Sequence, residues 1–270
     1  MKFIRHDDRK IAYTIEGKGV PILLLHGFCE DHFVWEEFKQ ELLEANYCTI
    51  CMDMPGFGES EVIPNLSIET IADIVYELIQ ALNLSKIILI GHSMGGYTAM
   101  AFARKYADAL IGLGMFHSHP YADHPAKKEN RDRSIEVVKA KGTALFVKQL
   151  IPSFFAPKFV KSSSFVVDKF IHRASNYSSQ AIIEALQAMR DRPDSAEVLA
   201  QLNCPILFII GKEDLAIPLD ATMEQTHLAQ TAMIEILDEV GHMGMIEARK
   251  KTQQIVLRFA AFCLHHFKKA

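Results

Sequence analysis

The sequence lacks both a long apolar run and a marked excess of one charge. A membrane-spanning helix needs roughly 20 consecutive apolar residues, and no run in this chain approaches that length. The 29 lysines and arginines nearly balance the 33 aspartates and glutamates, which leaves a net charge of -4. This balance gives no electrostatic case for binding nucleic acid or an anionic membrane. Residues 1–8 contain no apolar segment, so we do not expect a secretory signal there.

Cysteine is scarce and odd in number. The chain has 5 cysteines, of which Cys48 and Cys51 have a Cys-x-x-Cys spacing that zinc and redox sites also use. They lie in segment 47–52, which has the composition of a strand, and side chains three apart on a strand point to opposite faces. No second Cys or His pair follows at zinc-ligand spacing. We therefore expect buried thiols, no metal and a reducing, cytoplasmic location.

The remaining composition is typical of a globular α/β protein. Hydrophobic residues make up 49% and charged residues 23% of the 270 residues, which are ordinary values. Apolar, β-branched runs alternate with segments of helical periodicity. The pattern predicts strands at 2–6, 9–15, 21–25, 47–52, 86–90, 109–116, 205–210 and 232–237, and helices at 31–43, 67–82, 94–106, 218–228 and 245–267. Such alternation favours a mostly parallel, doubly wound sheet with helices on both faces.

The segment 118–202 interrupts this alternation. It is helical in pattern, charged on its faces and free of long apolar strands. We expect it to be a helical cap inserted into one loop of a core formed by residues 1–117 and 203–270. Ligands of such sheets bind beyond the carboxyl ends of the strands, so we expect the cap to cover the site.

The most informative stretch is Gly91-His92-Ser93-Met94-Gly95-Gly96. It joins a predicted strand to a predicted helix, and Gly-x-Ser-x-Gly in that context is typical of a nucleophile elbow. We expect a Cβ at Gly91 or Gly95 to clash, because strand and helix crowd each other there. The sharp turn strains the serine and holds its hydroxyl at the carboxyl end of a strand. Unpaired N–H groups at the helix N-terminus lie beside it.

A serine nucleophile needs a base, and the base needs an orienting acid. His242 is the candidate base, because it follows the last predicted strand in a loop with glycines on both sides. Asp214 is the candidate acid, directly after a predicted strand, with Glu213 and Asp238 as rivals. We prefer Asp214, since Asp238 is only four residues from His242 and is better placed to shape the loop. The resulting chain order of Ser93, acid and base occurs in known triads.

Two backbone N–H groups are candidates for an oxyanion hole. Phe28 follows the predicted strand 21–25, and Met94 follows Ser93 directly, so each can aim an N–H group at a substrate carbonyl. Because both residues act through the backbone, we expect their side chains to be free to contact substrate.

Other polar residues in these loops are expected to be structural. We expect the His26 ring to hold its loop by hydrogen bonds and the His92 ring to pack against neighbouring loops. Asp53 begins the loop Asp53-Met54-Pro55-Gly56-Phe57-Gly58-Glu59-Ser60, where one proline and two glycines indicate sharp turns. We expect its carboxylate to satisfy backbone donors in that loop.

These motifs, in chain order, resemble those of the α/β-hydrolase superfamily: His26-Gly27-Phe28, the 53–60 loop, the 91–96 elbow, Gly211-Lys212-Glu213-Asp214 and Gly241-His242. The resemblance covers nearly the whole chain outside 118–202. It is to the small, capped branch that includes esterases and carbon–carbon bond hydrolases. It implies a serine hydrolase with the triad Ser93, Asp214 and His242 that needs no cofactor. Members that cleave epoxides or carbon–halogen bonds use an aspartate nucleophile, and the serine here argues against both.

Hydrolysis of a small carboxylic ester with a short to medium acyl chain, through an acyl-enzyme, is the leading prediction. The alternative is a carbon–carbon bond hydrolase, or a lyase like those of the menaquinone pathway, with the same triad. Carboxylate-binding arginines in the cap would favour that alternative, and Arg131, Arg133 and Arg173 are available. A third possibility is a non-catalytic receptor on this fold. The sequence does not give the oligomeric state.

The side chains that contact substrate are expected to come mainly from the cap. They are mostly apolar, because a covered site of this kind buries an acyl chain. The candidates are His117, Phe146, Phe154, Phe155 and Met189.

Overall fold

The computed structural model describes residues 1–268 and contains one eight-stranded sheet. The strands are β1 (Lys2–His6), β2 (Arg9–Glu16), β3 (Pro21–Leu25), β4 (Cys48–Met52), β5 (Ile87–His92), β6 (Leu110–Phe116), β7 (Ile206–Gly211) and β8 (Ala232–Leu237). Their spatial order is β1-β2-β4-β3-β5-β6-β7-β8. The pairs β1–β2 and β2–β4 are antiparallel and all others are parallel. The predicted mostly parallel sheet is therefore confirmed.

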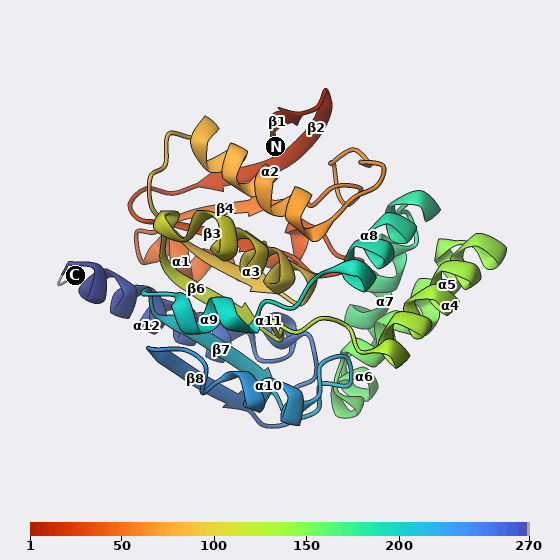
Figure 1. Ribbon diagram of the computed structural model, residues 1–270. Helices are drawn as coiled ribbons and strands as arrows, with labels where there is room; N and C mark the ends of the chain where they lie inside the picture. Colours follow the sequence, from red (N-terminus) through yellow and green to blue (C-terminus); the bar gives the residue numbers. More distant parts are fainter. Residues whose placement is uncertain (269–270) are drawn as a thin grey trace.

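Helices cover both faces of the sheet, as predicted (Figure 1). One face carries α2 (Ile68–Ala81), α3 (Met94–Tyr106), α9 (Ala196–Gln201) and α10 (Leu219–Gln225). The other face carries α1 (Lys39–Glu44) and α12 (Arg249–Phe267). The short α11 (Gly244–Glu247) precedes α12 in the chain, and the 3₁₀ turn η2 (Ala107–Ala109) joins α3 to β6. Since every parallel connection crosses a face, the carboxyl ends of β3 to β8 meet at one edge.

Two predicted helices are divided in the structure. The segment 31–43 forms the 3₁₀ turn η1 (His32–Trp35) and then α1, because the Asp31 side chain accepts from the Phe33 N–H at 2.9 Å and begins a tight turn. The segment 245–267 is broken at Ala248, whose φ of -131° lies outside the helical region.

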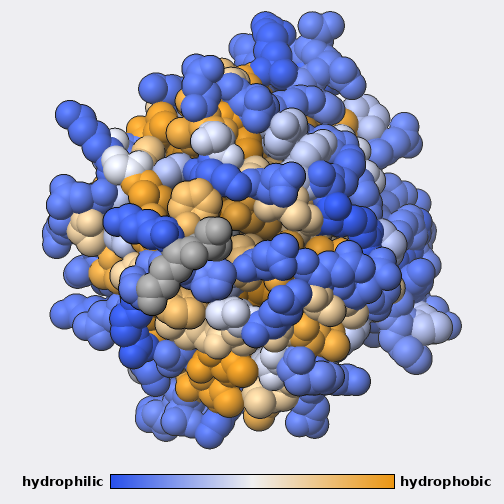
Figure 2. Space-filling view, turned by 60° about the vertical axis from the view of Figure 1, so that its left-hand side comes forward, coloured by the Kyte–Doolittle hydropathy of each residue, from blue (hydrophilic) through white to orange (hydrophobic). Residues whose placement is uncertain are grey.

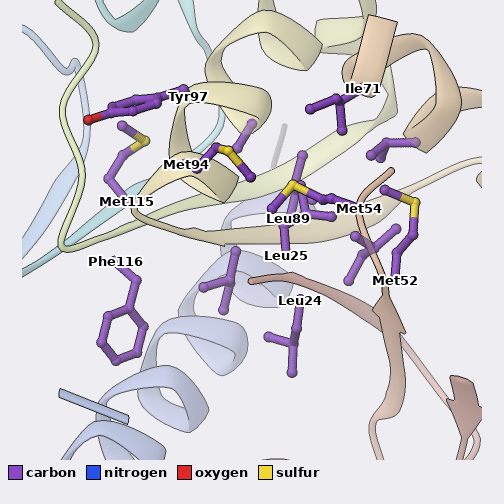
Figure 3. Packing of buried hydrophobic residues seen from close by; sticks show 14 of the residues in the cluster. Leu24, Leu25, Met52, Met54, Ile71, Leu89, Met94, Tyr97, Met115 and Phe116 are labelled. Carbon is purple, nitrogen blue, oxygen red and sulfur yellow. The ribbon is translucent and has the colours of Figure 1, made fainter. Parts of the chain in front are cut away.

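The position of β3 in the sheet explains why its sequence is a continuous apolar run. Leu23, Leu24 and Leu25 are all fully buried, and Leu24 and Leu25 point to opposite sides of β3 (Figure 3). An interior parallel strand is covered on both faces, so it has no polar alternation. The Met94 side chain joins this core layer beside Leu25 and Leu89 (Figure 3).

A group of helices lies between β6 and β7 in the chain, and all of them except α9 gather beside the carboxyl ends of the strands (Figure 1). Besides α9, it contains α4 (Pro125–Lys141), α5 (Thr143–Leu150), η3 (Ile151–Phe154), α6 (Pro157–Ser162), α7 (Ser164–Ala174) and α8 (Ser179–Asp191). The last element of the segment, α9, packs against α3 of the sheet-bearing part. The division into 1–117, 203–270 and 118–202 stays a prediction.

The cysteines described by the structure are all free thiols, and Cys48 and Cys51 are buried in β4. Burial raises the pKa of Cys51 to about 12, so this thiol stays protonated and unreactive at neutral pH. The expectation of small buried thiols at these two positions is confirmed.

None of the helices within residues 1–268 has the length and apolar content needed to cross a membrane. The face of the molecule shown in Figure 2 has hydrophobic areas between hydrophilic side chains. The exposed large hydrophobic residues include Ile234 of the edge strand β8 and Phe262 and Phe267 of α12.

Glycine is required where β5 crosses α3. A Cβ added at Gly91 would lie 2.1 Å from the Gly95 carbonyl oxygen, and one added at Gly95 would lie 2.6 Å from the Leu25 carbonyl oxygen. These contacts are with backbone atoms, which a side-chain rotation cannot relieve. The predicted clash at both glycines is confirmed.

We predict that Gly91→Ala destabilises the protein by about 3 kcal/mol, because overpacking here must displace a backbone. Gly142→Ala is the matched control. Gly142 also has a constrained backbone, with φ of +79°, but an added Cβ meets nothing within 4 Å. With a ψ of 167°, Gly142 lies in a backbone region almost confined to glycine, so this control should lose about 1–2 kcal/mol from backbone strain alone. Urea unfolding of both variants measures the difference, and equal losses would contradict the crowding argument.

Candidate active site

Ser93 occupies a one-residue turn between β5 and α3. Its φ of 51° and ψ of -113° lie outside the ordinary allowed regions, a strain of roughly 1–3 kcal/mol. The Ser93 N–H donates to the Phe116 carbonyl at 3.0 Å, and the Ser93 carbonyl accepts from the Gly96 N–H at 2.8 Å. The sheet and the helix therefore hold the serine in this conformation from both sides.

Asp214 and His242 form a buried pair at the ends of β7 and β8. The His242 Nδ1 lies 2.7 Å from the Asp214 Oδ2, and each side chain is only 1% exposed. The other carboxylate oxygen accepts from the N–H groups of Ala216 and Ile217, both at 2.9 Å. Burial alone would raise the pKa of Asp214, but the facing His242 ring holds it well below its usual range. The carboxylate is thus ionised and accepts the Nδ1 proton of His242.

The loop of His242 lies directly against the elbow. The His92 Nε2 lies 2.8 Å from the His242 carbonyl oxygen, and the two imidazole ring centroids are 4.8 Å apart. Because His92 precedes Ser93 in the chain, this contact brings the Asp214–His242 pair to the serine. The expectation that the His92 ring packs against neighbouring loops is confirmed.

Two backbone N–H groups that follow the neighbouring strands β3 and β5 have no partner among the described residues. Within residues 1–268, no acceptor takes the N–H of Phe28 or of Met94. The loop of Phe28 is held by the His26 ring, whose Nε2 accepts from the Met54 N–H at 2.9 Å. This is the structural role expected of His26. The Met94 side chain, however, is fully buried beside Leu25 and Leu89, and this packing does not support the expected substrate contact.

Asp238, the rival acid, faces away from this pair. Its side chain is 73% exposed and lies 2.6 Å from the Lys212 Nζ. Asp53 is fully buried and accepts from the N–H groups of His32 and Glu59 at 2.7 and 2.9 Å. Its expected role as an acceptor for backbone donors is confirmed.

The predicted substrate-contacting residues fall into two groups. The Phe146 ring lies 6.3 Å from the Phe28 ring, and the Phe154 ring lies 5.3 Å from that of His242. Phe155 instead stacks on Phe159 at 5.4 Å, inside the helices between β6 and β7. The first two side chains are therefore beside the candidate catalytic groups, whereas the packing of Phe155 does not support a substrate contact.

Met189 and His117 also have structural partners. The Met189 sulfur lies 3.4 Å from an Arg131 guanidinium nitrogen, among the helices between β6 and β7, which does not support a substrate contact. The His117 ring is fully buried, with its Nδ1 3.4 Å from the Asp214 Oδ2. That Nδ1 accepts from the Gly211 N–H at 3.2 Å, and burial lowers the pKa of His117 to about 4. His117 is thus a neutral imidazole behind the Asp214 carboxylate.

The cap arginines considered for binding a substrate carboxylate are already engaged. Arg131 is buried and pairs with Asp123, while Arg173 pairs with Asp31. Arg133 is exposed and donates to the side chain of a residue on its own helix. These contacts account for the three guanidinium groups without a ligand.

Among residues 1–268, the cluster Asp31, His32 and Asp53 has ligand atoms close enough together for a metal, all within 4.8 Å. The Asp53 Oδ1 lies 2.8 Å from the His32 Nδ1. Asp31 accepts from the Tyr177 hydroxyl at 2.6 Å and from Arg173. Internal donors thus use these carboxylates, and the cluster is explained as a hydrogen-bonded junction.

Two carboxylates that hold loops of the site, one buried and one half-buried, were not identified from the sequence. Glu30 is 3% exposed and follows the predicted oxyanion residue Phe28 by two positions. Glu247, five residues after His242, accepts from the N–H groups of Gly241 and Met243, at 3.1 and 3.0 Å. Burial raises the pKa of Glu247 despite these donors. The available sequence signal was a glutamate within five residues of a catalytic motif.

The chain belongs to the α/β-hydrolase superfamily. The family model described as alpha/beta hydrolase fold matches residues 20–134. A thermophilic esterase from Thermogutta terrifontis, solved with malate bound, is 32% identical and superposes with a TM-score of 0.90 over 94% of each chain. The family predicted from the motifs is therefore confirmed.

Curated relatives include hydrolases of more than one bond type. A 3-oxoadipate enol-lactonase from Acinetobacter baylyi is 28% identical over 233 residues, which are 85% of this chain and 84% of the relative. A 2-hydroxy-6-oxononadienedioate/2-hydroxy-6-oxononatrienedioate hydrolase from Escherichia coli is 27% identical over 276 residues, 93% and 91% of the two chains. These similarities support a hydrolase that acts on a small molecule.

Proposed function

We propose that this protein is a serine hydrolase that cleaves small carboxylic esters through an acyl-enzyme. The observation that carries the proposal is the buried 2.7 Å contact between Asp214 and His242 beside a strained Ser93. A carboxylate bonded to Nδ1 leaves the opposite nitrogen, Nε2, as the basic one. That arrangement is what activation of a serine hydroxyl requires.

In the proposed mechanism, His242 accepts the hydroxyl proton as the Ser93 Oγ attacks the ester carbonyl. The N–H groups of Phe28 and Met94, which have no protein acceptor within residues 1–268, stabilise the negative charge that develops on the carbonyl oxygen. His242 then donates its proton to the leaving alcohol, and an acyl group stays on Ser93. A water molecule, deprotonated by His242, releases the acid by the same steps in reverse order.

The alternative is cleavage of a carbon–carbon bond, the reaction class suggested by the name of the Escherichia coli relative. The pairing of Arg131 with Asp123 and of Arg173 with Asp31 weighs against it, because a substrate carboxylate would have to displace those partners. The aromatic side chains Phe28, Phe146 and Phe154 beside the site support an apolar acyl group instead.

We predict that Ser93→Ala lowers kcat for p-nitrophenyl butyrate by three or more decades, since no nucleophile remains. A fluorophosphonate probe should label the wild-type protein once, at Ser93, and should leave the variant unlabelled. Circular dichroism checks that the variant is folded. Turnover by folded Ser93→Ala near the wild-type rate would refute the nucleophile, and a folded wild type that neither reacts with the probe nor hydrolyses any ester would favour a binding protein.

The assignment of the acid is tested by a matched pair of substitutions. Asp214→Asn should reduce kcat by about 10⁴, because the amide holds the wrong imidazole tautomer. Asp238→Asn removes the same charge from an exposed residue bound to Lys212, and should leave kcat within about twofold of the wild type. If Asp238→Asn were the more damaging change, Asp214 would not be the acid.

Acyl-chain preference is expected to reach an optimum between acetyl and hexanoyl esters. Each buried methylene should contribute about 0.8 kcal/mol, or roughly fourfold in kcat/KM, until the space beside Phe28, Phe146 and Phe154 is full. A series of p-nitrophenyl esters measures this profile, alongside a vinylogous diketone acid. A steady rise through lauroyl and palmitoyl esters would indicate a lipase, and cleavage of the diketone acid without ester turnover would establish the carbon–carbon alternative.

A further inference from the structure

The histidine before the serine has acceptors on both ring nitrogens. The His92 Nδ1 lies 3.1 Å from the Glu30 Oε2, and its Nε2 lies 2.8 Å from the His242 carbonyl oxygen. A carbonyl oxygen only accepts, so Nε2 carries a proton. The Glu30 Oε2 also accepts from the Gly27 N–H, and although burial alone would raise the pKa of Glu30, His92 and this N–H lower it. Glu30 is therefore an ionised carboxylate, which only accepts, so Nδ1 carries a proton as well. With both nitrogens protonated, the ring is an imidazolium paired with a carboxylate.

The pair is sealed from solvent. His92 is fully buried and Glu30 is 3% exposed. Other titratable groups around the ring are His242 and His117, with ring centroids 4.8 and 6.2 Å away, and Asp214. Burial alone would lower the pKa of His92, but the Glu30 carboxylate reverses this and raises it. A buried ion pair is retained at the cost of desolvating both charges, which calls for an explanation.

Glu30 connects the pair to the loop of Phe28. The Glu30 Oε2 also accepts from the Gly27 N–H at 2.8 Å. A Cβ added at Gly27 would lie 2.6 Å from the His92 Nδ1 and 2.9 Å from the Glu30 Oε1. The backbone that presents the Phe28 N–H therefore rests directly on the ion pair.

We propose that Glu30 and His92 are a positioning pair that holds the oxyanion loop and the loop of the base in register with Ser93. Glu30 fixes the backbone of Gly27-Phe28 after β3, and His92 fixes the backbone of His242 after β8. The two side chains meet at the elbow, so one ion pair ties three loops together. Neither side chain touches the reacting atoms. The inference rests on the proposed triad and adds two residues that act through it.

Loss of either partner should therefore lower kcat more than it raises KM. Displacement of a catalytic group by about 1 Å can reduce the rate roughly 10²-fold, so we expect Glu30→Gln and His92→Asn each to lower kcat about 10- to 100-fold, with KM changed less than about threefold. If the two residues act as a unit, the double variant should lose about as much as either single variant.

Glu77→Gln is the matched control. Glu77 also pairs with a histidine, since its Oε2 lies 2.9 Å from the His6 Nδ1, but that pair joins β1 to α2, away from the elbow. The control should keep wild-type kcat. Glu30→Gln with a kcat within twofold of Glu77→Gln would overturn the proposal.

A second measurement does not depend on turnover or on the folding of a variant. In isotope-labelled wild-type protein at pH 7.5, the His92 ring should show two protonated nitrogens, assigned by correlating the ring signals with the backbone signals of the same residue. A neutral His92 ring in the wild type would overturn the ion pair. Fluorophosphonate labelling of the same wild-type sample tests the proposed function separately, so failure of the triad and failure of the positioning pair are distinguishable.

Discussion

The close crossing of β5 and α3 is the constraint on which the candidate site depends. The two backbones approach until a single methyl group at Gly91 would lie 2.1 Å from the Gly95 carbonyl oxygen. At that separation only one residue joins the strand to the helix, and Ser93 must adopt a positive φ. The same turn leaves the Met94 N–H at the start of a helix without an intrahelical acceptor. One packing constraint thus positions both the proposed nucleophile and half of the proposed oxyanion hole.

Two buried carboxylates and one half-buried carboxylate determine where the other loops lie relative to this crossing. Asp214, Glu30 and Glu247 each accept from backbone N–H groups of the loops they hold. A buried carboxylate is costly unless hydrogen bonds or a partner charge offset its desolvation. Asp214 and Glu30 also face a histidine. The loops are therefore held by charge-assisted hydrogen bonds, which are more directional than the apolar packing beneath them.

Local sequence patterns predicted the strands and the turn at Ser93, because these depend on residues close together in the sequence. The strands follow from apolar, β-branched runs, and the elbow follows from Gly91 and Gly95 between a strand and a helix. Asp214 and His242 were found because each begins or follows a glycine-containing loop at a strand end. Glu30 was missed because its partner His92 is 62 residues away, and no periodicity reports a contact of that range. The Met94 side chain and the packing of Phe155 likewise depend on neighbours distant in sequence.

The helices between β6 and β7 are attached to the same loops that carry the proposed catalytic groups. Arg173 and Tyr177 bind Asp31, directly after the Phe28 loop. At the other side, the Glu247 carboxylate accepts from the Ala156 N–H at 2.8 Å while it also holds the loop of His242. Each attachment joins the segment between β6 and β7 to a loop of the candidate site. A change in this segment should therefore displace the Phe28 N–H or the His242 ring, and so act on kcat as well as on substrate binding.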